Sequence, residues 1–193
     1  RLPPARASTR ELAAWAIGRT LEERRPLATD LATAEALCRP RDRGLLRQLV
    51  LGTVRWLLRL DEIVRQASSR PLSRIDPLIL APLRLGVYQL VFLDGVPAHA
   101  AVDESVAMAR NRTHKGAAGF VNAVLRQVSR KPRLEDWPVR GGNSVSRLAI
   151  EQSHPLFLVQ RWLRRIGEQA TRSLLEANNR PRGLHLLTFS DRG

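Results

Sequence analysis

The stretch DRGLLRQLVLGTVRWLLRL, residues 42–60, decides the fold class. At about 100° per residue, its apolar side chains share one broad arc of a helical wheel, and its arginines occupy the other side. The apolar arc holds Leu45, Leu46, Leu49, Val50, Thr53, Trp56, Leu57 and Leu60. Leu51 and Leu58 interrupt the arginine side, which indicates a second packing surface there. We therefore predict one long amphipathic helix, capped by Asp42, that two helical bundles share.

Helical periodicity continues on both sides of this stretch. Ser8 followed by Glu11 is a capping-box pattern that opens a helix to about Arg25, and Pro26 ends that helix. Further helices are expected over residues 29–38, 61–69, 77–93, 97–110 and 115–130. No convincing alternating strand precedes residue 180, so we predict an all-α domain whose short loops join neighbouring helices.

The composition changes after Lys131. Residues 131–147 contain two prolines and two adjacent glycines with little periodicity, which is typical of an exposed linker. Two more helices are expected over 155–166 and 168–177, and residues 184–189 then alternate weakly like the start of a strand. We divide the chain into a helical domain over 1–131, a linker over 132–152, and a helical segment over 153–193 that leads into an α/β region.

The chain is strongly basic. Lysine plus arginine number 32 against 18 acidic residues, for a formal net charge of +14. Only Lys115 and Lys131 are lysines, so nearly all of the positive charge is guanidinium, which forks onto phosphates and stacks on bases. This balance predicts a polyanionic partner, with RNA the first candidate. An arginine-rich genome would produce the same composition without a partner, and that alternative stays open.

The sequence has no pattern typical of a disulfide framework, a metal site, a dinucleotide-binding loop or a membrane span. The single cysteine, Cys38, allows no disulfide framework and predicts a reducing, cytoplasmic location. The four histidines lack metal-ligand spacing, and no strand precedes the glycines after Lys115 as a dinucleotide loop requires. We therefore assign no catalytic residue, no metal and no cofactor to this chain. The longest apolar run, residues 77–93, is interrupted by Arg84 and Gln89 and predicts a core helix, not a membrane span.

Four side chains are candidates for RNA contacts. Arg6 and Arg10 precede or open the first helix, and Lys115 and Phe120 lie in the first turns of the helix over 115–130. Helix N-termini offer amides to phosphate oxygens, and a partly exposed phenyl ring offers a surface on which a base can stack. The alternatives are a core aromatic for Phe120 and solvated surface cations for the others.

Two further charges, Arg55 and Glu104, have apolar neighbours at helical spacings. A helix that carried them against the core would bury them, and an unpaired buried charge is costly. We therefore predict an ion pair between them that joins the helix over 42–60 to the helix over 97–110. The alternative for Arg55 is a phosphate ligand.

Five blocks occur in a fixed order: DRGLLRQLVLGTVRW (42–56), PLRLGVYQLVFLDGVPAHAAVDESV (82–106), KGAAGFVNAVLR (115–126), SHPLFLVQRW (153–162) and EANNRP (176–181). In this order they resemble the N-terminal region of the Fmu/Sun (RsmB) family of 16S ribosomal RNA cytosine-5 methyltransferases. The N-terminal domain of that family has the fold of the NusB antitermination factor. The last two blocks favour the methyltransferase over the free-standing antitermination factor.

The resemblance implies a NusB-like fold of two small helical bundles, with RNA contacts from Arg6, Arg10, Lys115 and Phe120. It also implies a catalytic half beyond an RNA-recognition-like region, where a Gly-rich motif binds S-adenosylmethionine and a cysteine attacks cytosine. None of these catalytic elements occurs in this sequence, and Cys38 lies in the wrong domain for the nucleophile. S-adenosylmethionine is therefore expected only for the catalytic domain, which is absent from this chain.

Three function classes follow. The first is an RNA-binding, substrate-recruiting region of such a methyltransferase, with small-subunit ribosomal RNA as its partner. The second is a stand-alone NusB-like adaptor in transcription antitermination, which would add a protein partner. The third is a basic helical protein on acidic membranes; it is disfavoured because the apolar faces are needed for the core, so no membrane partner is expected.

Overall fold

A computed structural model of the chain describes residues 7–113 and 115–180, and for Lys115 it describes only the backbone. These residues form helices and turns, and no strand occurs among them. The α-helices are α1 Thr9–Leu21, α2 Leu27–Leu37, α3 Arg43–Arg55, α4 Leu57–Ala67, α5 Pro77–Phe92, α6 Ala98–Arg112, α7 Lys115–Ser129, α8 Ser144–Glu151 and α9 Leu156–Asn179. The predicted all-α class is confirmed for this part of the chain. The strand predicted over residues 184–189 lies outside the described residues.

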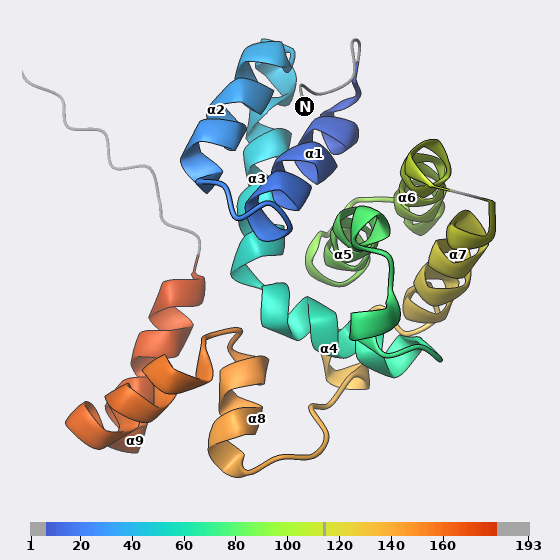
Figure 1. Cartoon of the computed structure of the whole chain (residues 1–193). Coiled ribbons are helices and arrows are strands. Elements are labelled where there is room, and N and C mark those ends of the chain that lie inside the picture. The colour runs from blue at the N-terminus through green and yellow to red at the C-terminus, as the bar shows by residue number, and fades with distance from the viewer. Residues whose placement is uncertain (1–6, 114, 181–193) are drawn as a thin grey trace, which may run out of the picture.

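Two groups of helices share α5, which lies between them (Figure 1). α1 and α3 pack against α5 on one side, with α2 covering both, while α4, α6 and α7 contact α5 elsewhere on its surface. α5 is apolar almost all round, and a helix of that kind must be covered on all sides. The two-bundle arrangement that the resemblance implies is therefore present. The helix that the bundles share is α5, however, and not the stretch over residues 42–60.

That stretch forms two helices instead of the single predicted one. α3 ends at Arg55 and α4 begins at Leu57, because Trp56 leaves helical geometry at φ −93° and ψ 16°. The backbone N–H of Leu58, which the break frees, donates to Oγ of Ser153 at 3.0 Å. The predicted apolar arc is still the buried one, and its members with no exposure are Leu46, Leu49, Val50, Thr53 and Leu60. A contact from the far end of the chain thus stabilises the break.

α3 and α5 approach each other closely at Gly52. Tyr88 of α5 lies across this glycine, and a Cβ at position 52 would be 2.0 Å from the tyrosine Oη. Tyr88 also stacks on Phe92 with ring centroids 5.6 Å apart, and Phe92 contacts Trp56 at 4.8 Å. This row of rings joins α5 to the α3–α4 junction.

Arg84, in the middle of α5, is nearly buried and is neutralised by two carboxylates. Its guanidinium donates two hydrogen bonds to Asp61 on α4, at 2.7 and 3.0 Å, and a third to Glu22 at the end of α1, at 3.1 Å. A buried cation destabilises a fold unless it is paired and hydrogen-bonded. The Arg84 contacts therefore connect α1, α4 and α5 at one point.

Part of the segment 132–152, predicted as an exposed linker, packs against the helical domain, whereas residues 140–144 are exposed. Trp137 is 4% exposed and belongs to the main core. Arg59 of α4 holds this segment, because its guanidinium donates to the carbonyl oxygens of Leu134 at 3.2 Å and Trp137 at 2.7 Å. α8, which the sequence pattern does not predict, contacts both α4 and α9. The expected exposure is wrong for Trp137 and Val139, because proline and glycine mark turns, whereas exposure depends on long-range contacts. The division of the chain at residues 131 and 152 stays a prediction.

α9 is divided by Gly167, which has φ 77° and ψ 175°. Only glycine adopts such a conformation without strain. The break falls where the sequence predicts the end of one helix at residue 166 and the start of another at residue 168, so that prediction is confirmed. α8 and α9 bury a small core of their own, formed by Leu148, Ala149, Val159 and Leu175.

Candidate nucleic-acid interface

The first turn of α1 is closed by the predicted capping box. Oγ of Ser8 accepts from the backbone N–H of Glu11 at 3.2 Å, and the Glu11 carboxylate accepts from the N–H of Ser8 at 2.8 Å. The aligned peptide dipoles of the helix concentrate partial positive charge at this end. Such an end attracts anions, phosphates among them.

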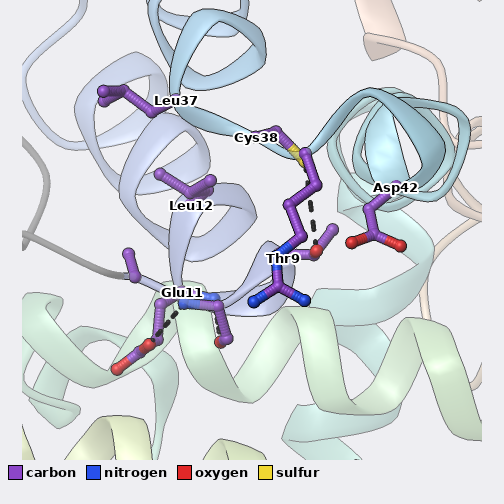
Figure 2. A pocket seen from close by; sticks show the side chains of 9 residues that line it. Thr9, Glu11, Leu12, Leu37, Cys38 and Asp42 are labelled. Atoms are coloured by element: carbon purple, nitrogen blue, oxygen red, sulfur yellow. Dashed lines mark hydrogen bonds between the residues drawn. The ribbon is translucent and has the colours of Figure 1, made fainter.

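A pocket of 680 Å³ lies beside this turn, between the start of α1 and the α2–α3 connection (Figure 2). Leu12 and Leu37 lie on one side of it, and Thr9, Cys38 and Asp42 lie on the other. The Thr9 hydroxyl is 4.0 Å from Sγ of the buried Cys38. The exposed Arg39 also lines the pocket, so a hydroxyl, a guanidinium and a helix N-terminus meet there. These groups bind phosphate oxygens in nucleic-acid complexes, and the carboxylates of Glu11 and Asp42, which also line the pocket, oppose them in part.

Arg10, a predicted RNA contact, is tied into the fold. Its Nη1 lies 3.0 Å from Oε1 of Glu104 on α6, and its Nε donates to Oε1 of Gln89 on α5 at 2.5 Å. Gln89 is 1% exposed, so Arg10 supplies the donor that a buried amide oxygen needs. The Arg10 side chain keeps 19% exposure. These contacts give Arg10 a structural role whether or not it also meets RNA.

The predicted ion pair between Arg55 and Glu104 is wrong. In the described ranges Glu104 pairs with Arg10, and Arg55 is within ion-pair distance of no carboxylate. Arg55 lies near Tyr88, where burial raises the pKa of the tyrosine and the charge of Arg55 lowers it in part. The prediction treated residues 42–60 as one helix, and the break at Trp56 removes that premise. Glu104 takes its arginine partner from α1 instead.

Phe120 lies on α7 with its ring partly packed against the main core. The guanidinium carbon of Arg70 is 5.3 Å from the centroid of this ring, which is a cation–π contact. The sequence pattern does not indicate Arg70, because it precedes a proline in a turn far from residue 120. The pair places a cation and an aromatic ring on one surface, an arrangement that suits a phosphate and a stacked base.

The remaining predicted RNA contacts are only partly placed. Lys115 begins α7, but its side chain is outside the described part of the structure, and Arg6 is outside it entirely. In the part that is described, no hydrogen bond, ion pair or ring contact joins Arg10 to Phe120. The same residues contain no group of three or more His, Cys, Asp or Glu side chains placed to hold a metal ion. None of their helices is both long enough and apolar enough to cross a membrane.

The structure thus defines a basic, all-helical domain of two bundles around one central helix, followed by the packed helices α8 and α9. A sequence model of the NusB family matches residues 7–130. The chain belongs to the NusB family, and the resemblance stated from its sequence blocks is confirmed for this region.

The chain is also similar to part of longer proteins, which are named as ribosomal RNA methyltransferases. It is 38% identical over 138 residues to a probable ribosomal RNA small subunit methyltransferase B of Bacillus subtilis, covering 69% of this chain and 29% of that protein. It is 31% identical over 170 residues to ribosomal RNA small subunit methyltransferase B of Serratia proteamaculans, covering 88% of this chain and 38% of that protein. The chain therefore spans about a third of the length of these relatives.

Proposed function

We propose that this chain is the RNA-binding, substrate-recruiting region of a 16S ribosomal RNA (cytosine-5) methyltransferase. The observation that carries the proposal is the extent of the similarity. The match to the Serratia methyltransferase covers 170 residues, whereas the NusB-family match ends at residue 130. Since few residues precede residue 7, the longer match must continue into α8 and α9. These helices are thus shared with a methyltransferase and are not part of the NusB-like domain alone.

RNA binding in this proposal rests on positive charge presented by a rigid helical scaffold. The pocket beside the start of α1 offers Arg39, the Thr9 hydroxyl and the helix N-terminus to phosphate oxygens. Phe120, with Arg70 stacked on it, offers a ring to a base. Arg6 and Lys115, whose side chains lie outside the described part of the structure, would add two further positive charges. Cations of this kind hold the backbone of RNA without reading its sequence, and the ring adds a stacking contact.

Methyl transfer itself is assigned to a region outside this chain. S-adenosylmethionine would supply the methyl group there, and the proposal places neither the cofactor nor the nucleophile on any residue of this sequence. Cys38 is buried at the end of α2, beside Thr9, and is given no role in the chemistry. We accordingly expect no heat of binding when S-adenosylmethionine is titrated into this chain, and micromolar binding would contradict the assignment.

A second candidate is a NusB-like adaptor that joins RNA to a protein partner in transcription antitermination. The match of the NusB family to residues 7–130 favours it as much as the first. The two candidates differ in what the full-length protein does. Cytosine methylation that is lost when residues 7–130 are deleted supports recruitment, whereas RNA-dependent capture of a transcription protein with unaffected methylation supports the adaptor.

Fluorescence anisotropy with a labelled fragment of small-subunit ribosomal RNA, at several salt concentrations, tests RNA binding by the chain. The logarithm of the affinity should fall linearly with the logarithm of salt. Arg6→Ala should flatten that slope by about 0.7 to 0.9, the value of one lost phosphate contact. Phe120→Ala should weaken binding and leave the slope unchanged, because stacking releases no counterion. A chain that binds no RNA even at low salt would overturn the proposal.

A further inference from the structure

A basic pocket of 610 Å³ lies between the C-terminal ends of α4 and α7 and the segment that follows α7. Its lining includes Arg65 and Gln66 of α4, Gln127 and Lys131 at the end of α7, and Trp137 and Arg140 beyond it. We call it the Trp137 groove. Its volume is within the range of about 300 to 1,000 Å³ that ligand sites of proteins occupy.

Hydrogen bonds fix the wall that residues 131–141 contribute to the groove. The indole Nε1 of Trp137 donates to the carbonyl oxygen of Lys131 at 2.8 Å, and Nε2 of Gln66 donates to the carbonyl oxygen of Pro138 at 2.9 Å. Nη2 of Arg59, on α4, donates to the carbonyl oxygen of Trp137. The segment is therefore held in place before any ligand arrives, which lowers the entropy lost on binding.

The two carboxylates near the groove form ion pairs with arginines, whereas two of the cations that line it form none within the described residues. Asp136 accepts from Arg133 at 3.1 Å, and Glu62 accepts from Arg65 at 2.7 Å in each of two hydrogen bonds. Lys131 and Arg140 are exposed, and neither forms an ion pair with any residue in the described ranges. The groove thus presents an excess of positive charge with donors that no protein group satisfies.

We propose that the Trp137 groove binds the phosphodiester backbone of RNA through Lys131 and Arg140. This inference rests on the proposed RNA-binding function and adds a contact surface on residues beyond the NusB-family match. Arg140 offers the planar fork that fits two phosphate oxygens, and Lys131 offers a point charge to a neighbouring phosphate. The amide of Gln127, which also lines the groove, adds a polar contact. We expect these contacts to be independent of base sequence, because Lys131 and Arg140 would bind phosphates and not the edges of bases.

An acidic protein segment is the rival ligand, since carboxylates also pair with arginine and lysine. RNA is favoured because the lining is polar, with Trp137 offering little exposed ring to an apolar side chain. Protein interfaces usually bury an apolar centre, whereas interfaces with nucleic acid are more polar and more positively charged.

The first test compares two double variants that each remove two positive charges. Lys131→Ala/Arg140→Ala alters the groove. Arg164→Ala/Arg165→Ala alters two exposed arginines of α9 that form no ion pair within the described residues. In salt-dependent anisotropy titrations with RNA, the groove variant should lose affinity at least about tenfold, and its slope should fall by about 1.4 to 1.8 for two phosphate contacts. The α9 variant should change the slope by less than half of that. Equal effects of the two variants would overturn the groove proposal and leave RNA binding by the chain intact.

The second test follows the indole N–H resonance of Trp137 by NMR during titration with inorganic tripolyphosphate, RNA or poly-glutamate. Tripolyphosphate and RNA should shift this resonance in the wild type and in the α9 variant, but not in the groove variant. If tripolyphosphate shifts it and RNA does not, the groove binds anions but not RNA, and the proposal fails. A poly-glutamate shift at lower concentration than RNA would assign the groove to an acidic protein. Absence of any RNA binding in both tests would overturn the proposed function as well.

Discussion

Nη1 of Arg10 and Oε1 of Glu104 lie 3.0 Å apart and join the first turn of α1 to the middle of α6. The two partners are not equally important. Arg10 also satisfies the buried amide of Gln89, whereas the Glu104 side chain is 40% exposed. Removing the arginine therefore leaves an unpaired buried acceptor, and removing the carboxylate does not.

We expect Arg10→Ala to lower the free energy of unfolding by about 1 to 3 kcal/mol, the cost of an unsatisfied buried polar group. Glu104→Gln should cost less than about 1 kcal/mol, as exposed ion pairs do. Urea denaturation measures both. Equal losses for the two variants would show that the ion pair, and not the Gln89 contact, accounts for the effect of Arg10. RNA titrations of Arg10→Ala are informative only after this stability loss has been measured.

Gly52 tests the close approach of α3 and α5. A Cβ there would meet the Tyr88 ring, so Gly52→Ala should destabilise the protein by about 1 to 3 kcal/mol through overpacking. Gly44 is the matched control, because it lies in the same helix and a Cβ there would meet nothing within 4 Å. Gly44→Ala should instead stabilise the protein by about 0.5 to 1 kcal/mol. Thermal denaturation measures the Tm of each variant. If both variants have a higher Tm than the wild type, the Gly52–Tyr88 contact does not constrain the fold.

Glu62 should make stability depend on pH in the acid range. Burial raises the pKa of this carboxyl, but hydrogen bonds from Arg65 and Gln66 outweigh burial and hold its pKa below the ordinary value of 4.5. A depressed folded-state pKa stabilises the protein above the unfolded-state pKa, and the stabilisation is lost as pH falls through the folded-state value. Glu62→Gln should therefore cost about 1 to 3 kcal/mol at pH 7, and this difference should shrink below about pH 4.5.

Urea denaturation of the wild type and Glu62→Gln from pH 7 to pH 3 measures that difference. Glu135→Gln is the control, because the Glu135 side chain is 71% exposed and its removal should matter little at any pH. A Glu62→Gln effect that stays constant down to pH 3 would contradict the predicted linkage.

Arg59 should decide whether residues 131–142 stay packed. It is 5% exposed, and burial lowers its pKa. Its Nη2 donates to the carbonyl oxygens of Leu134 and Trp137, whereas its buried Nε and Nη1 have no hydrogen-bond partner among the described residues. Arg59→Ala should increase amide hydrogen exchange in residues 131–142 by at least about tenfold, which corresponds to about 1.4 kcal/mol of lost local stability. Arg133→Ala, which removes an exposed cation of the same segment, is the control and should change exchange little. Unchanged exchange in Arg59→Ala would mean that Trp137 alone holds the segment.

Features that depend on local sequence were predictable here. The capping box at Ser8, the buried arc of residues 42–60 and the division of α9 at Gly167 all follow from spacing within a few residues. Each of these is set by helix geometry or by the conformational freedom of glycine, which act over one or two turns.

The failures share a different cause. The break at Trp56, the Arg10 partner of Glu104 and the burial of Trp137 depend on groups that are 60 or more positions away. Periodicity carries no information about such contacts. A tryptophan between prolines and glycines was still a signal that could have been used, because so large an apolar side chain is seldom left in solvent. Arg70 beside Phe120 offered no comparable signal.

The clamp of Arg59 on the segment after α7 also determines how the two parts of the chain are coupled. A flexible tether as long as residues 132–152 would let its ends separate by about 25 Å on average and would leave their mutual orientation free. In that case a strand of RNA held by the helical domain would meet α9 only at a modest effective concentration. The packed segment and the contact of α8 with α4 remove this averaging, so that α8 has a defined position on the helical domain. Insertions into residues 132–152 would therefore change how α8 and α9 are positioned on the helical domain. Insertions into a flexible tether would change only the distance that the tether can span.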